Sequence, residues 1–253
     1  GDNIWLNMVI MLLIIIGGIG FLTWEDFYKN KLNFRRYRMQ SKVILITTVL
    51  LIILPAILFF ANDFGEFLFK KRLLYSIFQS VTTRTAGFNT ADLPLMTEAG
   101  KSVMILLMLI GGSPSSTAGG MKTTTFAVLI LNAFATFRSR EDAGAFGRRF
   151  DVQVIKNAAT IAMLYLMLFF GGGIIISAYE GLPVLTCFYE AASAIGTVGL
   201  TLGVTPDLHI ISRLILIVLM YLGRVGGLTL IYAVFSNKNK RKAKLPMEKI
   251  TVG

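Results

Sequence analysis

Two short tetrapeptides, each built around a glycine, carry the chemistry that this sequence offers most clearly. They read Thr85-Ala86-Gly87-Phe88 and Thr197-Val198-Gly199-Leu200. Extended backbone at such positions can turn successive carbonyl oxygens to one side, where they replace the water shell of a cation. Glycine suits this task because it reaches dihedral angles that other residues avoid and lets backbones crowd around an axis.

A Thr-x-Gly triplet alone is a weak motif, so its surroundings decide its meaning. Each triplet follows an apolar piece that is too short to cross a membrane, residues 73–83 and 183–195, and each piece lies between two longer apolar spans. A short helix there aims its partly negative C-terminal end at the triplet, which favours a cation. The repeated context favours a pore lining; interfacial helices whose glycines serve turns or packing are the alternative.

A third candidate is the run GGSPSSTAGG in the middle of the apolar stretch 100–137. Proline removes a helical donor and the glycines weaken the helix on both sides. Backbone groups freed at membrane depth need partners or water. We interpret the run as a movable gate below the triplets, with a fixed kink for helix packing as the alternative. Its residues are Gly111, Gly112, Ser113, Pro114, Ser115, Ser116, Thr117, Ala118, Gly119 and Gly120.

Two basic residues complete the candidate gate. Arg224 lies inside an apolar span, where the related segments carry Gly18 and Gly112. A central arginine costs about 2.5–3.5 kcal/mol on insertion scales, so it usually faces an aqueous cavity or a partner. We expect Arg224 to face the pore and pair with the glycine-rich run; a structural ion pair or contact with the inner interface is the alternative. Lys122 is assigned to the gate, or else extends to the cytoplasmic surface.

The elements that must position these residues are membrane helices. Of 253 residues, 55% are hydrophobic and only 15% charged, whereas a soluble domain has about a quarter charged. Several uncharged stretches reach the roughly 20 residues that hydrocarbon about 30 Å thick requires. The net charge of +11 is concentrated beside the spans, at 29–42, 138–156 and 238–249. Such clusters mark the cytoplasmic side rather than a nucleic-acid partner.

The positive clusters predict an order of segments that repeats along the chain. Residues 4–24, 100–137 and 210–235 run inward, 43–61 and 153–179 run outward, and the short pieces 73–83 and 183–195 lie between them. LIIIGGIGFLT at 13–23 matches LMYLGRVGGLT at 219–229, and FQSVTT at 78–83 resembles YEAASA at 189–194. The repeating unit is therefore span, pore helix, loop and span.

Four motifs together resemble the superfamily of K⁺ transporters that contains TrkH, KtrB and plant HKT proteins, most nearly bacterial KtrB. They are SVTTRTAGFNT at 80–90, GGSPSSTAGGMKTTT at 111–125, SAIGTVGL at 193–200 and LMYLGRVGGLT at 219–229. The resemblance covers essentially the whole chain. It implies an all-α polytopic membrane protein whose repeated span–pore helix–filter loop–span units form a pseudo-fourfold cation pore. It makes Gly87 and Gly199 the third and fourth filter glycines, the glycine-rich run the intramembrane gate, and Arg224 the pore-facing arginine.

The same resemblance divides the chain into repeats. Residues 1–28 become the inward span of an incomplete upstream repeat, and we expect the chain to begin within a longer polypeptide. Residues 29–137 form a complete third repeat, with its pore loop at 73–90 and its broken inward helix at 100–137. Residues 138–236 form a complete fourth repeat, with its pore loop at 184–201 and its inward helix at 210–235. Residues 237–253 form a basic cytoplasmic tail.

The resemblance also implies the function and the partners. We expect the pore-forming subunit of a K⁺ uptake system that is not itself an enzyme, with K⁺ as the transported ion and no organic cofactor. It implies a multi-pass protein of the plasma membrane, surrounded by lipid, with a cytoplasmic C-terminus. The expected partners are a second copy in a homodimer and a cytosolic nucleotide-binding regulatory subunit of the KtrA type, with no nucleic acid.

Two other functions stay open at this point. One is a Na⁺-permeable transporter of the same fold. The other is an intramembrane serine hydrolase that uses Ser115 or Ser116, which requires a nearby base. The only histidine, His209, is expected at the opposite face with no carboxylate or cysteine cluster for a metal, and Lys122 is a speculative substitute base. Arg84 either binds carbonyl groups of its loop or lies on the outer surface.

Overall fold

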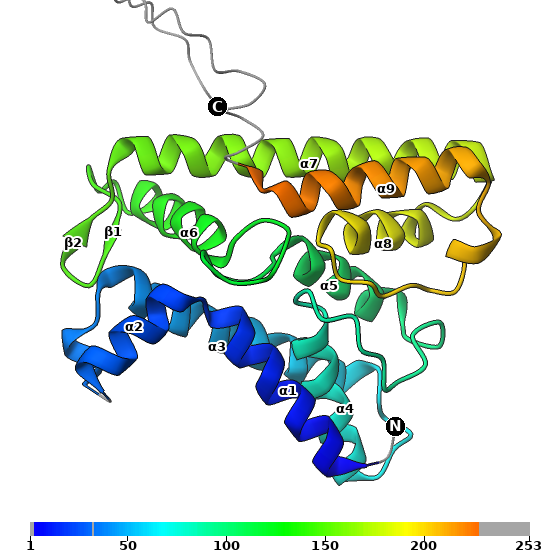
Figure 1. Ribbon diagram of the computed structural model, residues 1–253, viewed down its shortest axis with the longest axis horizontal. Coiled ribbons are helices and arrows are strands. Elements are labelled where there is room, and N and C mark those ends of the chain that lie inside the picture. The colour runs from blue at the N-terminus through cyan, green and yellow to red at the C-terminus, as the bar shows by residue number, and fades with distance from the viewer. Residues whose placement is uncertain (1–2, 32, 228–253) are drawn as a thin grey trace, which may run out of the picture.

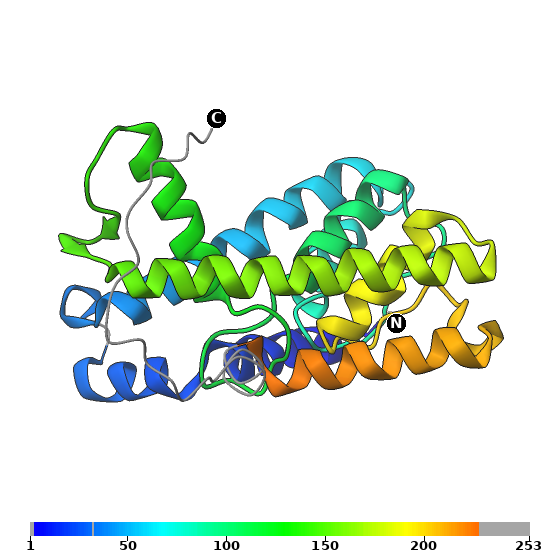
Figure 2. The same cartoon turned by 90° about the horizontal axis from the view of Figure 1, so that it is seen from above.

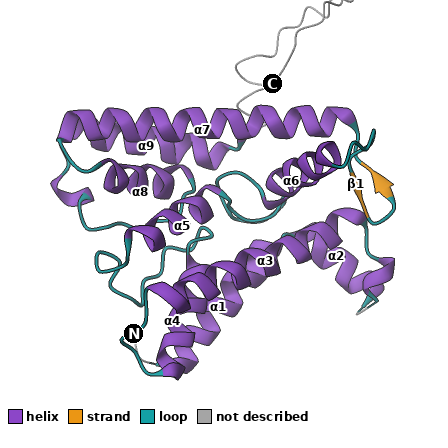
Figure 3. Cartoon of the chain, turned by 180° about the vertical axis from the view of Figure 1, so that it is seen from behind, coloured by secondary structure: helices purple, strands orange, loops and turns teal. Residues whose placement is uncertain are grey.

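The computed structural model describes residues 3–31 and 33–227, which are mostly helical (Figures 1 and 3). In chain order the helices are α1 (Ile4–Ile19), α2 (Phe21–Asn30), α3 (Met39–Asn62), α4 (Phe69–Thr82), α5 (Glu98–Leu109), α6 (Thr123–Phe137), α7 (Val152–Glu180), α8 (Val184–Ile195) and α9 (Ile210–Val225). Two 3₁₀ turns, Phe34–Arg36 and Thr205–Asp207, lie between them. An antiparallel hairpin of β1 (Gly144–Ala145) and β2 (Arg148–Arg149) is a small departure from the all-helical prediction.

The two outward spans are continuous helices. Among the described residues, α3 and α7 are each long and apolar enough to cross a membrane, and α1 with α2 meets the same test as a bent pair. Large apolar side chains on α3 and α7 point away from the protein, among them Ile46, Leu50, Ile53, Met163, Met167 and Phe170. Soluble monomers rarely expose such wide apolar surfaces. These helices therefore present the face expected of a protein embedded in lipid.

The sequence predicted one continuous span over residues 4–24, but the structure divides this span into two helices. α1 and α2 meet at Gly20 with a bend of 92°. Gly20 has φ 88° and ψ 146°, a conformation that residues with a Cβ rarely adopt. A side chain there would also come within 2.3 Å of the carbonyl oxygen of Pro114. The bend is therefore fixed by both the dihedral angles and the close approach of another segment.

The last inward span ends in the same way. α9 stops at Val225, and the next residue, Gly226, has φ 88° and ψ 140°. Gly226 is the residue that the sequence comparison pairs with Gly20, so the repeat extends to the backbone conformation. The helix expected to continue to residue 235 is thus interrupted ten residues earlier. Residues 228–235 and the tail at 237–253 lie outside the described residues.

The third inward span is broken at its centre. α5 ends at Leu109 and α6 begins at Thr123, and the intervening loop lies in the middle of the molecule (Figure 1). α7, α8 and α9 pack together on one side of this loop, and α1, α3 and α4 pack on the other. The view from above shows α8 between α7 and α9 (Figure 2). The two short helices α4 and α8 are thereby held inside the structure by longer helices.

The core lies where α4 and α8 meet α5. The side chain of Met104 on α5 is fully buried. Its Sδ lies 3.5 Å from Nε2 of Gln79 on α4 and 3.8 Å from the hydroxyl of Tyr189 on α8. Thioether sulfur is polarizable and accepts weak hydrogen bonds. Both short helices therefore pack against the same side chain.

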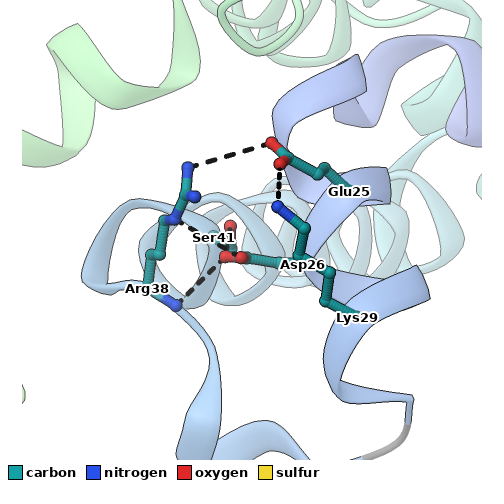
Figure 4. A network of polar contacts seen from close by, with 5 residues as sticks. All are labelled: Glu25, Asp26, Lys29, Arg38 and Ser41. Carbon is teal, nitrogen blue, oxygen red and sulfur yellow. Dashed lines mark hydrogen bonds and ion pairs between the residues drawn. The ribbon is translucent and has the colours of Figure 1, made fainter.

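A buried carboxylate ties α2 to the start of α3 (Figure 4). Asp26 is 2% exposed and accepts hydrogen bonds from the backbone amide of Arg38 at 3.0 Å and from the hydroxyl of Ser41 at 2.6 Å. The Arg38 guanidinium lies 3.6 Å from the other carboxylate oxygen. Glu25 and Lys29 form an exposed pair beside it, which contributes little. Asp26 therefore fixes the bent half of the first span.

Two of the three basic clusters lie at the same end of the molecule. The ring of Phe34, within the first cluster, packs 6.4 Å from the ring of Phe146, within the hairpin of the second cluster. The ammonium group of Lys42 lies over both rings, 5.8 Å and 5.5 Å from their centres. The structure thus groups these clusters as the positive-inside pattern requires. The third cluster lies outside the described residues.

Candidate functional site

The two Thr-x-Gly loops have the same backbone shape. Thr85 and Thr197 have φ of 66° and 50°, and Gly87 and Gly199 have φ of 72° and 92°. Threonine is β-branched and strongly disfavours this region, so each threonine stores strain of about 1–3 kcal/mol. Such strained residues cluster at functional sites. The repeat therefore reproduces an unusual conformation as well as a sequence.

The two loops touch at their glycines. A Cβ added to Gly87 would lie 2.2 Å from the carbonyl oxygen of Val198 and 3.3 Å from the Cα of Gly199. A Cβ added to Gly199 would find only the Cα of Gly87, at 3.9 Å. Gly87 is therefore required by space as well as by dihedral angle, whereas Gly199 is required by its dihedral angle.

Hydrogen bonds tie the amide groups of both loops back to the short helices. The amides of Ala86 and Gly87 donate to the carbonyl oxygen of Thr82, at 3.2 and 3.4 Å. The amide of Val198 donates to the carbonyl oxygen of Ser193 at 2.8 Å. By contrast, none of the carbonyl oxygens of residues 85–87 or 197–199 accepts a hydrogen bond from a described residue. The loops thus present acceptors whose donors must come from elsewhere, such as water or a cation.

Sequence reasoning missed one residue of this site, Glu190 of α8. Its carboxylate is buried and accepts hydrogen bonds from the segment that follows the fourth loop: the Thr201 hydroxyl, the Leu202 amide and the Thr205 hydroxyl. An acidic residue inside a short apolar piece is the signal that would have found it, because a buried carboxylate needs donors.

The glycine-rich run forms a loop that is closed at its base. The amide of Gly111 donates to the carbonyl oxygen of Met121 at 2.8 Å, and the amide of Met121 donates to that of Leu109 at 3.3 Å. The amide of Thr123 donates to the carbonyl oxygen of Gly112 at 3.1 Å. These bonds join the end of α5 to the start of α6. The residues between form the protruding part, and we call residues 111–122 the central loop.

The central loop lies directly against the fourth Thr-x-Gly loop. A Cβ on Gly119 would come within 2.1 Å of the Thr197 hydroxyl, and one on Gly120 within 3.3 Å of the Cα of Gly196. The amide of Gly120 donates to the carbonyl oxygen of Gly223 on α9 at 3.2 Å. The glycines of this loop thus allow it to fit between α9 and the fourth loop.

The other side of the central loop is bound to the break between α1 and α2. The amide of Ser113 donates to the carbonyl oxygen of Gly18 at 2.9 Å, and the amide of Phe21 donates to that of Ser115 at 3.2 Å. The loop therefore bridges the first and last inward spans. Any displacement of the loop must break backbone hydrogen bonds on one of these sides.

Arg224 and Lys122 bind neighbouring carbonyl groups of the central loop. The Arg224 guanidinium donates to the carbonyl oxygen of Thr117, and the Lys122 ammonium donates to that of Ala118. The structure thus brings Arg224 and the loop together, as expected. Lys122 is half-buried and its ammonium binds the loop, which contradicts the alternative in which it extends to the cytoplasmic surface. Two positive charges therefore lie beside the same turn.

Arg84 is buried, not on the outer surface. It is 6% exposed, and its Nε has no hydrogen-bond partner among the described residues. With Thr85, Ala86 and Phe88 it lines a cavity of about 330 Å³ that α1 and the tip of the central loop complete. The cavity thus lies between the third loop and the central loop. Burial thus contradicts the outer-surface interpretation, and among the described residues no hydrogen bond joins the Arg84 side chain to a carbonyl group of its loop.

Comparison with known proteins identifies the chain. The sequence profile of the TrkH family, described as a cation transport protein, matches residues 1–242. The chain belongs to the TrkH family. This TrkH-family chain is 38% identical to the potassium/sodium uptake protein NtpJ of Enterococcus hirae, over 99% of its own length and 58% of that of NtpJ. It is 34% identical to the Ktr system potassium uptake protein B of Bacillus subtilis, over 98% of its own length and 56% of the relative.

A solved structure confirms the fold of this TrkH-family chain. The crystal structure of the potassium transporter TrkH from Vibrio parahaemolyticus superposes with a TM-score of 0.75 at 20% identity. The superposition covers 92% of this chain and 53% of the other. The fold is thus that of an all-α polytopic membrane protein, as the sequence predicted. The chain spans somewhat more than half the length of the relatives compared here.

The serine-hydrolase interpretation finds no support in this TrkH-family chain. The Ser113 hydroxyl lies 3.0 Å from that of Thr123, and the Lys122 ammonium is bound to a backbone carbonyl. Nδ1 of His209 lies 2.8 Å from Glu180, a carboxylate partner that the sequence did not reveal. Among residues 3–31 and 33–227, no hydrogen bond joins a serine of the loop to a lysine or histidine. The family and the relatives named above are transport proteins.

Proposed function

We propose that this chain forms part of the conduction pathway of a K⁺ uptake system, with residues 85–88 and 197–200 as two segments of its selectivity filter. One observation carries the proposal: the carbonyl oxygens at 85–87 and 197–199 accept no hydrogen bond from described residues, while neighbouring amides are bound to α4 and α8. Oxygens held in this way can replace the hydration water of a monovalent cation. The names of NtpJ and of the Ktr system protein support K⁺ as the ion.

The central loop is proposed as the gate of this pathway, acting with Lys122 and Arg224. It packs against Thr197 on one side and against the α1–α2 break on the other. The two bound cationic groups oppose the passage of another cation by charge. Opening then requires the Arg224 guanidinium to release the carbonyl oxygen of Thr117.

The partners and orientation belong to the same proposal. We infer a multi-pass protein of the plasma membrane with a cytoplasmic C-terminus, assembled as a homodimer in lipid. The basic surface formed by the clusters at 29–42 and 138–156 is proposed to dock a cytosolic nucleotide-binding subunit of the KtrA type. The shared position of these clusters and the word "system" in the name of the Bacillus relative support this.

The test uses the complete gene that encodes this chain, expressed in bacteria that lack K⁺ uptake. We expect the wild type to restore growth at low K⁺, and Gly87→Ser and Gly199→Ser to lose the preference for K⁺ over Na⁺. Gly181→Ser is the matched control, because Gly181 also has a left-handed φ, 67°, and open space around it, and it lies outside the filter segments and outside residues 201–205. Unchanged ion preference in both filter variants contradicts the filter assignment.

Na⁺ is the second candidate for the transported ion, because the name of the relative NtpJ includes sodium. Measuring Na⁺ and Rb⁺ uptake by the same wild-type cells distinguishes the two. Uptake of Na⁺ that equals that of Rb⁺, a K⁺ analogue, makes the protein a Na⁺-permeable transporter of this fold.

A further inference from the structure

The segment that follows the fourth filter loop is held by a single buried carboxylate. Glu190 is 4% exposed. Its Oε1 accepts from the Thr201 hydroxyl at 2.8 Å and from the Leu202 amide at 2.9 Å, and its Oε2 accepts from the Thr205 hydroxyl at 2.7 Å. Hydrogen bonds to a charged acceptor are shorter and stronger than neutral ones. One side chain thus fixes three groups that lie 11 to 15 residues away in the sequence.

The two threonine hydroxyls also contact each other, at 2.9 Å. Each hydroxyl has one proton, so both cannot donate to Glu190 while one also donates to the other. The amide of Gly203 donates to the Thr201 hydroxyl at 2.9 Å. The Glu190 carboxylate accepts hydrogen bonds at the centre of this network, and none of the network's members is a basic side chain. Among the described residues, no lysine, arginine or histidine forms an ion pair with Glu190.

The same face of α8 holds the filter on both sides of Gly199. Ser193 lies three residues after Glu190, so the two side chains project from one side of the helix. The Ser193 hydroxyl accepts from the amide of Gly199 at 3.2 Å, and Glu190 binds Thr201. The carbonyl group of Gly199 lies between these two attachments along the chain. Its direction is therefore restrained from both ends.

The third repeat lacks this arrangement. The sequence comparison pairs Gln79 with Glu190, and Gln79 is fully buried. Its Nε2 faces Met104 Sδ, and its Oε1 has no hydrogen-bond partner among the described residues. Correspondingly, Phe88 after the third glycine is 54% exposed, whereas Leu200 after the fourth is 3% exposed. The residue directly after the filter glycine is therefore buried in the fourth repeat and exposed in the third.

We propose that Glu190 is a positioning residue for ion selection: it fixes the direction of the Gly199 carbonyl group by holding residues 201–205 against α8. This inference rests on the proposed function. It assigns the selectivity of the fourth segment to a side chain that does not touch the ion. A loss of Glu190 should therefore alter the ratio of K⁺ to Na⁺ uptake and not only the amount of protein.

The test compares Glu190→Gln with wild type, from the complete gene in cells that lack K⁺ uptake. We measure Rb⁺ and Na⁺ uptake and divide each by the amount of protein in the membrane. An amide has one acceptor oxygen and no charge, so we expect the Rb⁺ to Na⁺ ratio to fall about tenfold, the change expected for loss of one hydrogen bond to a charged group. Gln79→Met is the matched control, since it removes a buried amide from the other short helix and should leave the ratio unchanged.

A second pair of variants covers the case in which Glu190→Gln fails to reach the membrane. Thr201→Val and Thr205→Val each remove one donor to the carboxylate and keep the volume of the side chain. Both should lower the ratio in the same direction by a smaller factor. A wild-type ratio in Glu190→Gln, or in both valine variants, overturns the proposal. Failure of the wild type itself to take up Rb⁺ would instead reject the proposed function.

Discussion

The third and fourth Thr-x-Gly loops have the same dihedral pattern but are held by different means. Both loops are hydrogen-bonded to their own short helices, and the third loop is also confined by contact, because Gly87 lies against the backbone of Val198. The fourth loop has in addition the side chains of Ser193 and Glu190, which bind the amide of Gly199 and the segment that follows it. Gly199 itself has almost no neighbour on its side-chain face.

This difference shows that one backbone shape can be imposed in two ways within one chain. The fourth loop and α8 form a fixed unit, and the third loop fits against that unit. The two loops should therefore respond differently to equivalent substitutions. Three experiments test that comparison.

The largest difference is expected between Gly87→Ala and Gly199→Ala. Both create a left-handed alanine, which costs about 1–2 kcal/mol. Only Gly87→Ala also places a methyl group 2.2 Å from a backbone oxygen, which side-chain rotation cannot relieve. We expect Gly87→Ala to abolish growth at low K⁺ and Gly199→Ala to retain part of it. Equal loss in both variants, with equal amounts of protein in the membrane, would contradict the difference in support.

A smaller effect is expected from Arg224→Ala, which tests the loop packed against the fourth repeat. Arg224 binds the central loop beside the fourth loop, and its positive charge opposes a cation that passes the proposed gate. Its removal, together with the bond to Thr117, should raise Rb⁺ flux roughly tenfold. Lys122→Ala is the comparison variant and should also raise flux, because its ammonium binds the neighbouring carbonyl oxygen of Ala118. A fall in flux with normal protein amounts would instead favour a structural role for Arg224.

The smallest effect is expected from the hydroxyl groups that hold each loop. Thr82→Val removes a bond of 2.6 Å to the carbonyl oxygen of Phe88, and Ser193→Ala removes the acceptor for the Gly199 amide. Each should lower the free energy of unfolding by about 1 kcal/mol, measured by thermal unfolding in detergent. Only Ser193→Ala should also change the Rb⁺ to Na⁺ ratio, because the Gly199 amide shares a peptide plane with the carbonyl group of Val198, which is proposed to face the ion, whereas the Phe88 carbonyl group is already bonded to Thr82. A ratio change in Thr82→Val alone would reverse the assignment.

The sequence predicted the elements well because their signals are local. Uncharged stretches located α3 and α7, and the repeat of short apolar pieces located α4 and α8. The pairing of Gly20 with Gly226 was visible in the sequence, but both spans were expected to be continuous, and the structure ends a helix at each of these glycines. A single glycine in an apolar run is compatible with a straight span. What decides the bend at Gly20 is the approach of Pro114, a contact between distant segments.

The sequence located the parts of the candidate site that carry a recognisable motif. It did not locate contacts between residues that lie far apart in the sequence. The Thr-x-Gly triplets and the central loop lie in the expected order along the chain, and Arg224 meets the loop. Glu190 was passed over because its donors follow the filter, and no local pattern joins a carboxylate to them. The direction of Lys122 was left open between the gate and the cytoplasmic surface, because the sequence does not show whether a carbonyl group lies within reach of the ammonium. Ala118 supplies one.

The backbone hydrogen bonds that close the base of the central loop affect how the loop could move. Because Gly111 is joined to Met121, a movement of the tip would break its bonds to the neighbouring helices without changing the register of α5 and α6. Only a few residues then exchange one ordered arrangement for another, so the entropy change is small compared with unwinding a helix. A movement of this kind, proposed above for opening of the gate, would leave the lipid-facing helices α3 and α7 undisturbed.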